Sequence, residues 1–100
     1  MVRHIVIWKM LERNPVRLHS DCIEFRSKLL ALKGQIPFIH ALEVGINSGS
    51  APDGNHDIVL VADFNDFEEL KQYQKHPAHQ ALIEWLRGKR ELRAAVDYEI

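Results

Sequence analysis

The chain has 100 residues and a formal net charge of −1, so we expect a single domain spanning residues 1–100. Its 13 basic and 14 acidic side chains are mixed along the chain, and binding to nucleic acid or to an anionic membrane surface is therefore not expected. Arg3, His4 and Lys9 interrupt the apolar N-terminus, and no stretch approaches the roughly 20 apolar residues of a membrane span, so we expect neither a signal peptide nor a membrane segment.

The only cysteine, Cys22, cannot form a disulfide within the chain. It falls on the apolar stripe of a predicted helix, so we expect a small buried hydrophobic side chain and not a reactive thiol. A chain without disulfides and without a predicted signal peptide suits a reducing compartment. We therefore expect a cytoplasmic protein.

The first half of the chain predicts a strand, a helix and a second strand. Residues 2–11 are rich in β-branched and aromatic side chains, and both faces of this strand are largely apolar. We expect Gly34 to end the helix through a positive φ angle. Residues 38–46 follow Pro37 with the alternation of a half-buried strand. The apolar stripe of the helix is Leu18, Cys22, Phe25, Leu29 and Leu32.

Residues 58–62, IVLVA, are continuously apolar, which predicts a central strand covered on both faces. The turn-forming stretch 47–55, NSGSAPDGN, should join this strand to the preceding one as an antiparallel hairpin. After the strand, Asp66 and Glu69 have the spacing of a capping box, which predicts a helix that runs to about Lys75.

Pro77 should stop that helix and begin another, because proline lacks the backbone N–H of a helix interior yet suits a first turn. We expect the new helix to end near Gly88 or Leu92 and a last strand to cover residues 94–100. The order βαββαβ, with the second helix broken at His76-Pro77, predicts an α+β ferredoxin-like sandwich with a four-stranded antiparallel sheet.

A sheet with helices on one face leaves the other face bare. Strands 2–11 and 58–62 both place apolar side chains on that second face, namely Ile5, Ile7, Val59 and Val61. No further element remains to cover them. We therefore expect a homodimer through the sheet face opposite the helices, in which two sheets form a dimeric α/β barrel.

Three side chains could carry chemistry in a cleft between the sheet and the helices. His4 lies on the strand face that should meet the helices, Tyr73 closes the apolar stripe of the second helix, and His79 follows the restart at Pro77. We take them as candidate catalytic residues. The alternative is that each ring is simply buried and hydrogen-bonded to a backbone carbonyl. The candidate ligand-binding residues around them are Val6, Trp8, Leu60, Ala62, His76 and Ile83.

His79 should be neutral at pH 7, because burial and a helix N-terminus both oppose protonation and lower the pKa of an imidazole. We expect its ring within hydrogen-bond reach of Tyr73 or His4, directly or through one water. No acidic third ligand is spaced with His76 and His79, so we predict no metal and no other cofactor. Asp57, Asp63, Asp97 and Glu99 are expected on strand edges or on the dimer face.

Several stretches together are similar to one known family. VRHIVIWKM, IPFIHALEVGIN, DIVLVADF, NDFEELKQYQKHPAHQAL and AVDYEI, which span nearly the whole chain, resemble the stress-responsive α/β barrel (Dabb) domain, with YQKHPAH as the most specific part. The resemblance implies a ferredoxin-like subunit and a homodimeric barrel. It also implies a site, because a cofactor-free plant polyketide cyclase of this family uses residues that match His79, Tyr73 and His4.

The sequence is compatible with two functions. In the first, His79 abstracts an acidic C–H proton from a small, partly apolar, oxygen-containing molecule such as a polyketide, Tyr73 donates to the developing enolate oxygen, and His4 orients or shuttles the proton. In the second, a non-catalytic stress or ligand-binding dimer holds a ligand in the same cleft or fills the cleft with Trp8, which is bulkier than the aliphatic residue expected there. An open cleft beside His79 would favour the first function, and a cleft closed by Trp8 the second.

Overall fold

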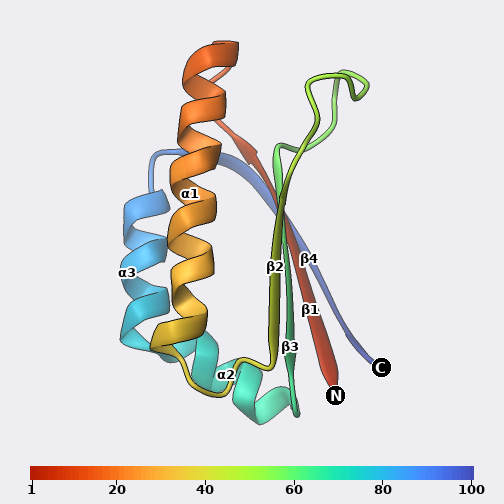
Figure 1. The fold of residues 1–100 in the computed structure, drawn as a ribbon, viewed down its shortest axis with the longest axis vertical. Helices are drawn as coiled ribbons and strands as arrows, with labels where there is room; N and C mark the ends of the chain where they lie inside the picture. The colour runs from red at the N-terminus through yellow and green to blue at the C-terminus, as the bar shows by residue number, and fades with distance from the viewer.

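The computed structural model describes residues 1–100 and has a ferredoxin-like fold, as the sequence predicts (Figure 1). Four antiparallel strands form one sheet in the order β2-β3-β1-β4. All three helices lie on the same face of this sheet. In chain order the elements are β1 (Val2–Met10), α1 (Pro15–Gln35), β2 (Ala41–Ile46), β3 (Ile58–Phe64), α2 (Phe67–Lys75), α3 (Pro77–Leu86) and β4 (Arg90–Glu99).

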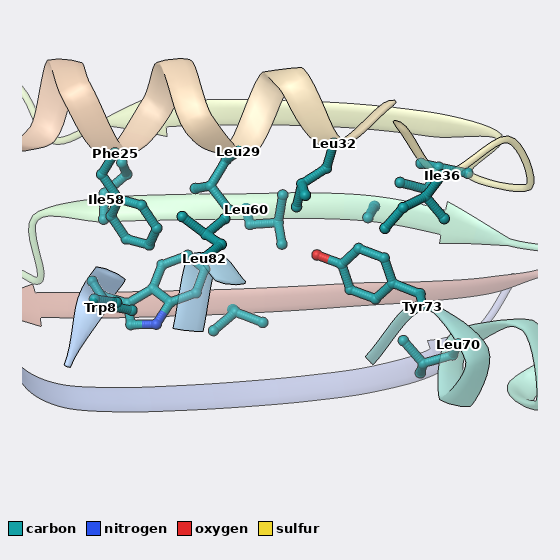
Figure 2. Close-up of a cluster of buried hydrophobic side chains, with 14 of the residues drawn as sticks. Trp8, Phe25, Leu29, Leu32, Ile36, Ile58, Leu60, Leu70, Tyr73 and Leu82 are labelled. Atoms are coloured by element: carbon teal, nitrogen blue, oxygen red, sulfur yellow. The ribbon is translucent and has the colours of Figure 1, made fainter. Parts of the chain in front are cut away.

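The core lies between the sheet and the helices. Side chains alternate along a strand, so the even-numbered residues of β1 all face the helices and are buried, while its odd-numbered residues are only half-buried. Trp8 and Leu60 from the sheet meet Phe25 and Leu29 from α1 in this layer (Figure 2). Cys22 is buried on the same helix, as predicted, and burial raises the pKa of its thiol to about 11.

Helix α1 begins at Pro15 and ends later than expected. The Asn14 side chain accepts hydrogen bonds from the N–H groups of Val16 and Arg17, which caps the first turn. The prediction that Gly34 ends the helix was wrong, because the helix continues to Gln35 without a positive φ angle. The completely buried Ile36 follows, and packing of this side chain into the core sets the end of the helix.

Other boundaries also differ from the predictions: β1 ends at Met10 and not at residue 11, and α3 ends at Leu86, two residues before Gly88, the nearer of its two predicted ends. Strand β2 begins at Ala41 and not at residue 38, while β3 continues beyond residue 62 to Phe64. Strand β4 begins at Arg90 and not at residue 94, because it pairs with β1 along almost the whole length of that strand. Gly88, with a φ angle of 80°, provides the tight turn between α3 and β4.

The break between α2 and α3 falls at Pro77, as predicted. The Asp66 side chain caps α2 by accepting from the Glu69 N–H at 2.8 Å, and the Glu69 carboxylate accepts from the N–H of Asn65 at 3.0 Å. At the start of α3, Nδ1 of His76 accepts from the Ala78 N–H at 3.1 Å. A histidine therefore serves as the cap of the helix that carries His79.

The second face of the sheet has no cover from this chain (Figure 1). At its centre lie four half-buried side chains, as expected, namely Ile5, Ile7, Val59 and Val61, and Val96 of β4 is exposed beside them.

None of the three helices has the length and apolar composition that a membrane-spanning helix needs.

Asp57 joins the start of β3 to the end of β1 and to the loop before α1. Its carboxylate accepts a hydrogen bond from the Met10 N–H at 2.8 Å and from Arg13 Nη1 at 2.9 Å, and the residue is only 6% exposed. The pairing raises the pKa of Arg13, mainly through this hydrogen bond. Asp57 therefore satisfies a buried backbone donor at the point where β1 leaves the sheet.

We predict that Asp57→Ala lowers the free energy of unfolding by about 1–3 kcal/mol, because it leaves the Met10 N–H buried without an acceptor. Urea denaturation followed by circular dichroism measures this loss. Asp53→Ala in the exposed β2–β3 loop is the matched control and should change stability by less than about 0.5 kcal/mol. Equal effects from both substitutions would contradict the role assigned to Asp57.

Candidate functional site

A cavity of about 530 Å³ lies between the helix face of the sheet and the helices. It is open, and Trp8 does not close it: the indole packs edge-to-face on Phe25, with ring centroids 4.8 Å apart, and forms part of the wall. Seven of the nine residues predicted for the site line this cavity: His4, Val6, Trp8, Leu60, Tyr73, His79 and Ile83.

The other two predicted residues, Ala62 and His76, do not line the cavity. Ala62 is completely buried next to His4 on the neighbouring strand, so its methyl group contacts the core. The ring of His76 is used as the cap of α3. Both residues were predicted to bind the ligand. The Ala62 side chain is instead packed in the core, and the His76 ring caps a helix.

Tyr73 reaches from α2 into the core, and its hydroxyl has no hydrogen-bond partner in the protein. Figure 2 shows the hydroxyl oxygen pointing inward from α2, towards the middle of the hydrophobic layer. The residue is 0% exposed, and this burial raises the pKa of the phenol well above its usual value. Tyr73 is therefore a neutral hydrogen-bond donor with a free O–H.

His79 lies against Tyr73, with ring centroids 4.5 Å apart. Its Nδ1 is 3.1 Å from the carbonyl oxygen of Gln74, and a carbonyl only accepts, so Nδ1 carries the proton and Nε2 has the free lone pair. Burial is the main reason that the pKa of His79 falls to about 4, as the sequence predicted in direction. Of the predicted hydrogen bond to Tyr73 or His4, the direct form is not present: Nδ1 of His79 bonds to the Gln74 carbonyl, and the Tyr73 hydroxyl has no partner in the protein.

His4 is 2% exposed and forms a hydrogen bond through Nδ1 with the carboxylate of Asp97. Its ring lies edge-on to that of Tyr73 at a centroid distance of 6.1 Å. Asp97 lies on the edge strand β4, in keeping with one of the two expected positions, and not on the dimer face, because the β1–β4 register pairs it with His4 on the helix face. An ionised carboxylate only accepts, so Asp97 fixes the ring of His4 with its proton on Nδ1.

The sequence analysis also missed polar residues at the wall formed by β4 and the end of α3. Arg87, Arg90 and Arg93 line the cavity. The sequence contained one signal for the residues of β4. Side chains alternate along a strand, so Arg93 and Asp97 share one face of β4 and Val96 lies on the other. No group of three or more His, Cys, Asp or Glu side chains is arranged to hold a metal ion.

The fold and this site define a ferredoxin-like α+β protein with an internal cavity between its sheet and its helices. The chain belongs to the stress responsive A/B barrel domain (Dabb) family, whose sequence pattern matches residues 2–100. It is 33% identical over 84 residues to an uncharacterized protein of Streptomyces coelicolor, and the match covers 81% of each chain.

Two solved structures are close to it. A dimeric protein of unknown function with a ferredoxin-like fold from Bacteroides fragilis is 34% identical, with a TM-score of 0.86 over 99% of this chain and 95% of its own. A dimeric ferredoxin-like protein of unknown function from Thermobifida fusca is 28% identical, with a TM-score of 0.78 over 99% and 90% of the two chains. Both relatives are thus dimers with this fold.

The lowered pKa of His79 gives a prediction for stability against pH. The unfolded chain binds a proton at this residue below about pH 6.5, whereas the folded chain does so only near pH 4. This titration therefore destabilises the fold as pH falls between these values, with a slope of at most about 1.4 kcal/mol per pH unit because a single proton is involved. Partial exposure of the ring makes the slope smaller than this limit. His79→Gln should reduce this acid-induced loss.

Chemical denaturation of both proteins at several pH values between 7 and 4 would measure the difference. His19→Gln on the exposed side of α1 is the control, and its pH dependence should match that of the parent protein. If His79→Gln follows the same curve as the parent, the histidine does not carry the lowered pKa.

Proposed function

We propose that this chain forms a homodimer that binds a small, partly apolar, oxygen-containing molecule in the cavity, and that His79 can act there as a cofactor-free general base. The observation that carries the proposal is the packing of a neutral His79 on Tyr73, whose buried hydroxyl has no partner in the protein, at one cavity that both residues line. A cavity of about 530 Å³ is within the usual range of small-molecule sites.

Each of the three residues has a distinct role in the proposed reaction. Nε2 of His79 accepts a proton from an acidic carbon, and the O–H of Tyr73 donates to the enolate oxygen that forms. His4, held by Asp97, moves or orients the proton. A base with a pKa of about 4 is weak, so it suits a carbon acid whose proton is already activated, such as the carbon between two carbonyl groups.

A polyketide-cyclase-like reaction is the narrower candidate. A poly-β-ketone chain carries several such activated carbons, and the apolar wall formed by Trp8, Phe25 and Leu29 would hold its hydrocarbon portion. The non-catalytic alternative, a ligand-binding dimer, requires the same cavity and would use the Tyr73 hydroxyl only to hold an oxygen of the ligand. The open cavity beside His79 therefore supports the catalytic hypothesis over a cleft filled by Trp8.

The proposed dimer forms through the bare face of the sheet. Ile5, Val59, Val61 and their apolar neighbours occupy the centre of that face. Ion pairs lie at its two ends: Arg3 with Asp63 at 2.9 Å, and Lys9 with Glu91 at 3.9 Å. An apolar centre with a charged rim is the usual composition of a protein interface. The relatives that share this fold at 34% and 28% identity are described as dimeric, which supports a homodimer.

We predict that the protein is a dimer at micromolar concentration, with about 800 Å² buried per subunit, and that Val61→Asp dissociates it. An unpaired carboxylate in the shared core would cost several kcal/mol. Size-exclusion chromatography with light scattering measures the mass, and circular dichroism reports folding. Val16→Asp, at a site that is 79% exposed on α1, is the control that should remain dimeric. A monomeric parent protein, or a dimeric Val61→Asp with unchanged melting temperature, would refute this interface.

The catalytic proposal predicts opposite effects of Tyr73→Phe on stability and on activity. The buried hydroxyl has no partner, so its removal should leave the fold as stable or raise its stability by about 1 kcal/mol. The same change removes the donor to the enolate and should slow catalysed enolisation at least about tenfold. The assay is deuterium incorporation into a partly apolar β-diketone such as 1-phenyl-1,3-butanedione, followed by NMR above the buffer rate.

His79→Gln should abolish the catalysed exchange in the same assay, because general-base catalysis typically contributes about 10²- to 10⁴-fold. His19→Gln is again the control and should retain the parent rate. Exchange at the buffer rate with the parent protein, or full activity in His79→Gln, would contradict the proposed role of this histidine.

A further inference from the structure

The cavity carries more positive charge than the composition of the chain suggests. Three of its lining residues are arginines, although the chain as a whole has a net charge of −1. Arg87 is paired with Glu84 at 3.1 Å. Arg90 and Arg93 form no ion pair and no side-chain hydrogen bond, so two guanidinium groups at the cavity have unused donors.

Arg93 belongs to the same site as Tyr73 and His79. The β1–β4 register pairs it with Trp8, whose side chain faces the helices, so Arg93 also points to the helix face of the sheet. Its charge is close enough to lower the pKa of both the Tyr73 hydroxyl and the His79 ring, although burial remains the larger effect on each. Arg90 pairs with Met10 and lies further along the same strand.

No Asp or Glu side chain lines the cavity, so no acidic group there neutralises these arginines. Asp97 lies on the same face of β4, but it is already bonded to His4. Glu91 lies next to Arg90 in sequence, but it reaches Lys9 on the opposite face of the sheet. An anion that enters the cavity would therefore meet free donors and little repulsion.

We propose that the ligand of this cavity is an amphipathic organic anion, whose carboxylate binds Arg93, assisted by Arg90, while its apolar body lies against Trp8, Leu82 and Leu86. The inference rests on the proposed function, since it requires that the cavity binds a small molecule. The planar fork of a guanidinium matches the two oxygens of a carboxylate, and such charge-assisted pairs are the strong ones among hydrogen bonds.

The arrangement also gives the ligand a direction. His4 and Asp97 are paired at one end of β4, and Arg93 and Arg90 come earlier on the same strand. Arg93 and Asp97 are four positions apart, which corresponds to about 13 Å along a strand. A bound acid would thus place its carboxylate at Arg93, its apolar body along the side of Trp8, and its far end towards Tyr73 and His79.

A matched pair of probes tests the inference: 4-phenylbutyrate and its neutral analogue 4-phenylbutanamide. Isothermal titration calorimetry at pH 7 with the parent protein should show that the acid binds at least about tenfold more tightly than the amide. Arg93→Met, which keeps the length of the side chain, should bring the two dissociation constants to within about twofold of each other. Arg93→Lys should retain part of the preference.

Arg17→Met, at an exposed site on α1, is the control that should keep the full preference for the acid. NMR gives a second readout, because the Nε–H signal of Arg93 should shift with the acid and not with the amide. Equal binding of acid and amide to the parent, or an unchanged preference in Arg93→Met, would overturn the anion inference and leave the proposed binding cavity intact. Failure of both probes to bind at millimolar concentration would count against the proposed cavity function itself.

Discussion

The structure depends on one central strand whose two faces are both apolar. In β1 the even-numbered side chains are buried beneath the helices, while Ile5 and Ile7 lie on the opposite face and are half-buried. A single layer of helices can cover only one side of a sheet, and in a chain of this length no other element is left. The covered face contains the cavity, and the bare face provides the surface that the proposed dimer would bury. Both functional surfaces therefore follow from the alternation of one strand.

The covered side of the sheet is unusual in the polar groups that it buries. A hydroxyl without a partner and an imidazole with a lowered pKa both reduce stability, and neither is required to hold the fold together. Asp57 shows the contrasting case of a buried carboxylate that satisfies a backbone donor and a guanidinium. Tyr73 and His79 are buried polar groups that each keep an unused hydrogen-bonding atom beside one cavity, which is the physical reason to regard them as a site. Asp57 has its hydrogen bonds satisfied within the protein and is therefore structural support.

Much of the fold could be read from local patterns. The apolar stripe from Cys22 to Leu32, the cap at Asp66 and the proline at 77 act through bonds and contacts within one or two helical turns, so their consequences are visible in the sequence. The boundaries that were wrong depend on distant partners. Strand β4 starts at Arg90 because β1 is there to pair with it, and α1 passes Gly34 because Ile36 has a pocket in the core.

By itself the sequence determined the ferredoxin-like topology, the apolar second face and the candidates His4, Tyr73 and His79, because each of these follows from side-chain periodicity or from a helix break. Only the tertiary structure decided that Asp97 binds His4, a contact between residues 93 positions apart. It also decided that Arg93 shares their cavity and that the Gln74 carbonyl holds the proton of His79. The physical reason is strand register: the alternation in β4 separates Arg93 and Asp97 from Val96, but only the pairing with β1 decides which of the two sets faces the helices, and a shift of one residue would exchange them.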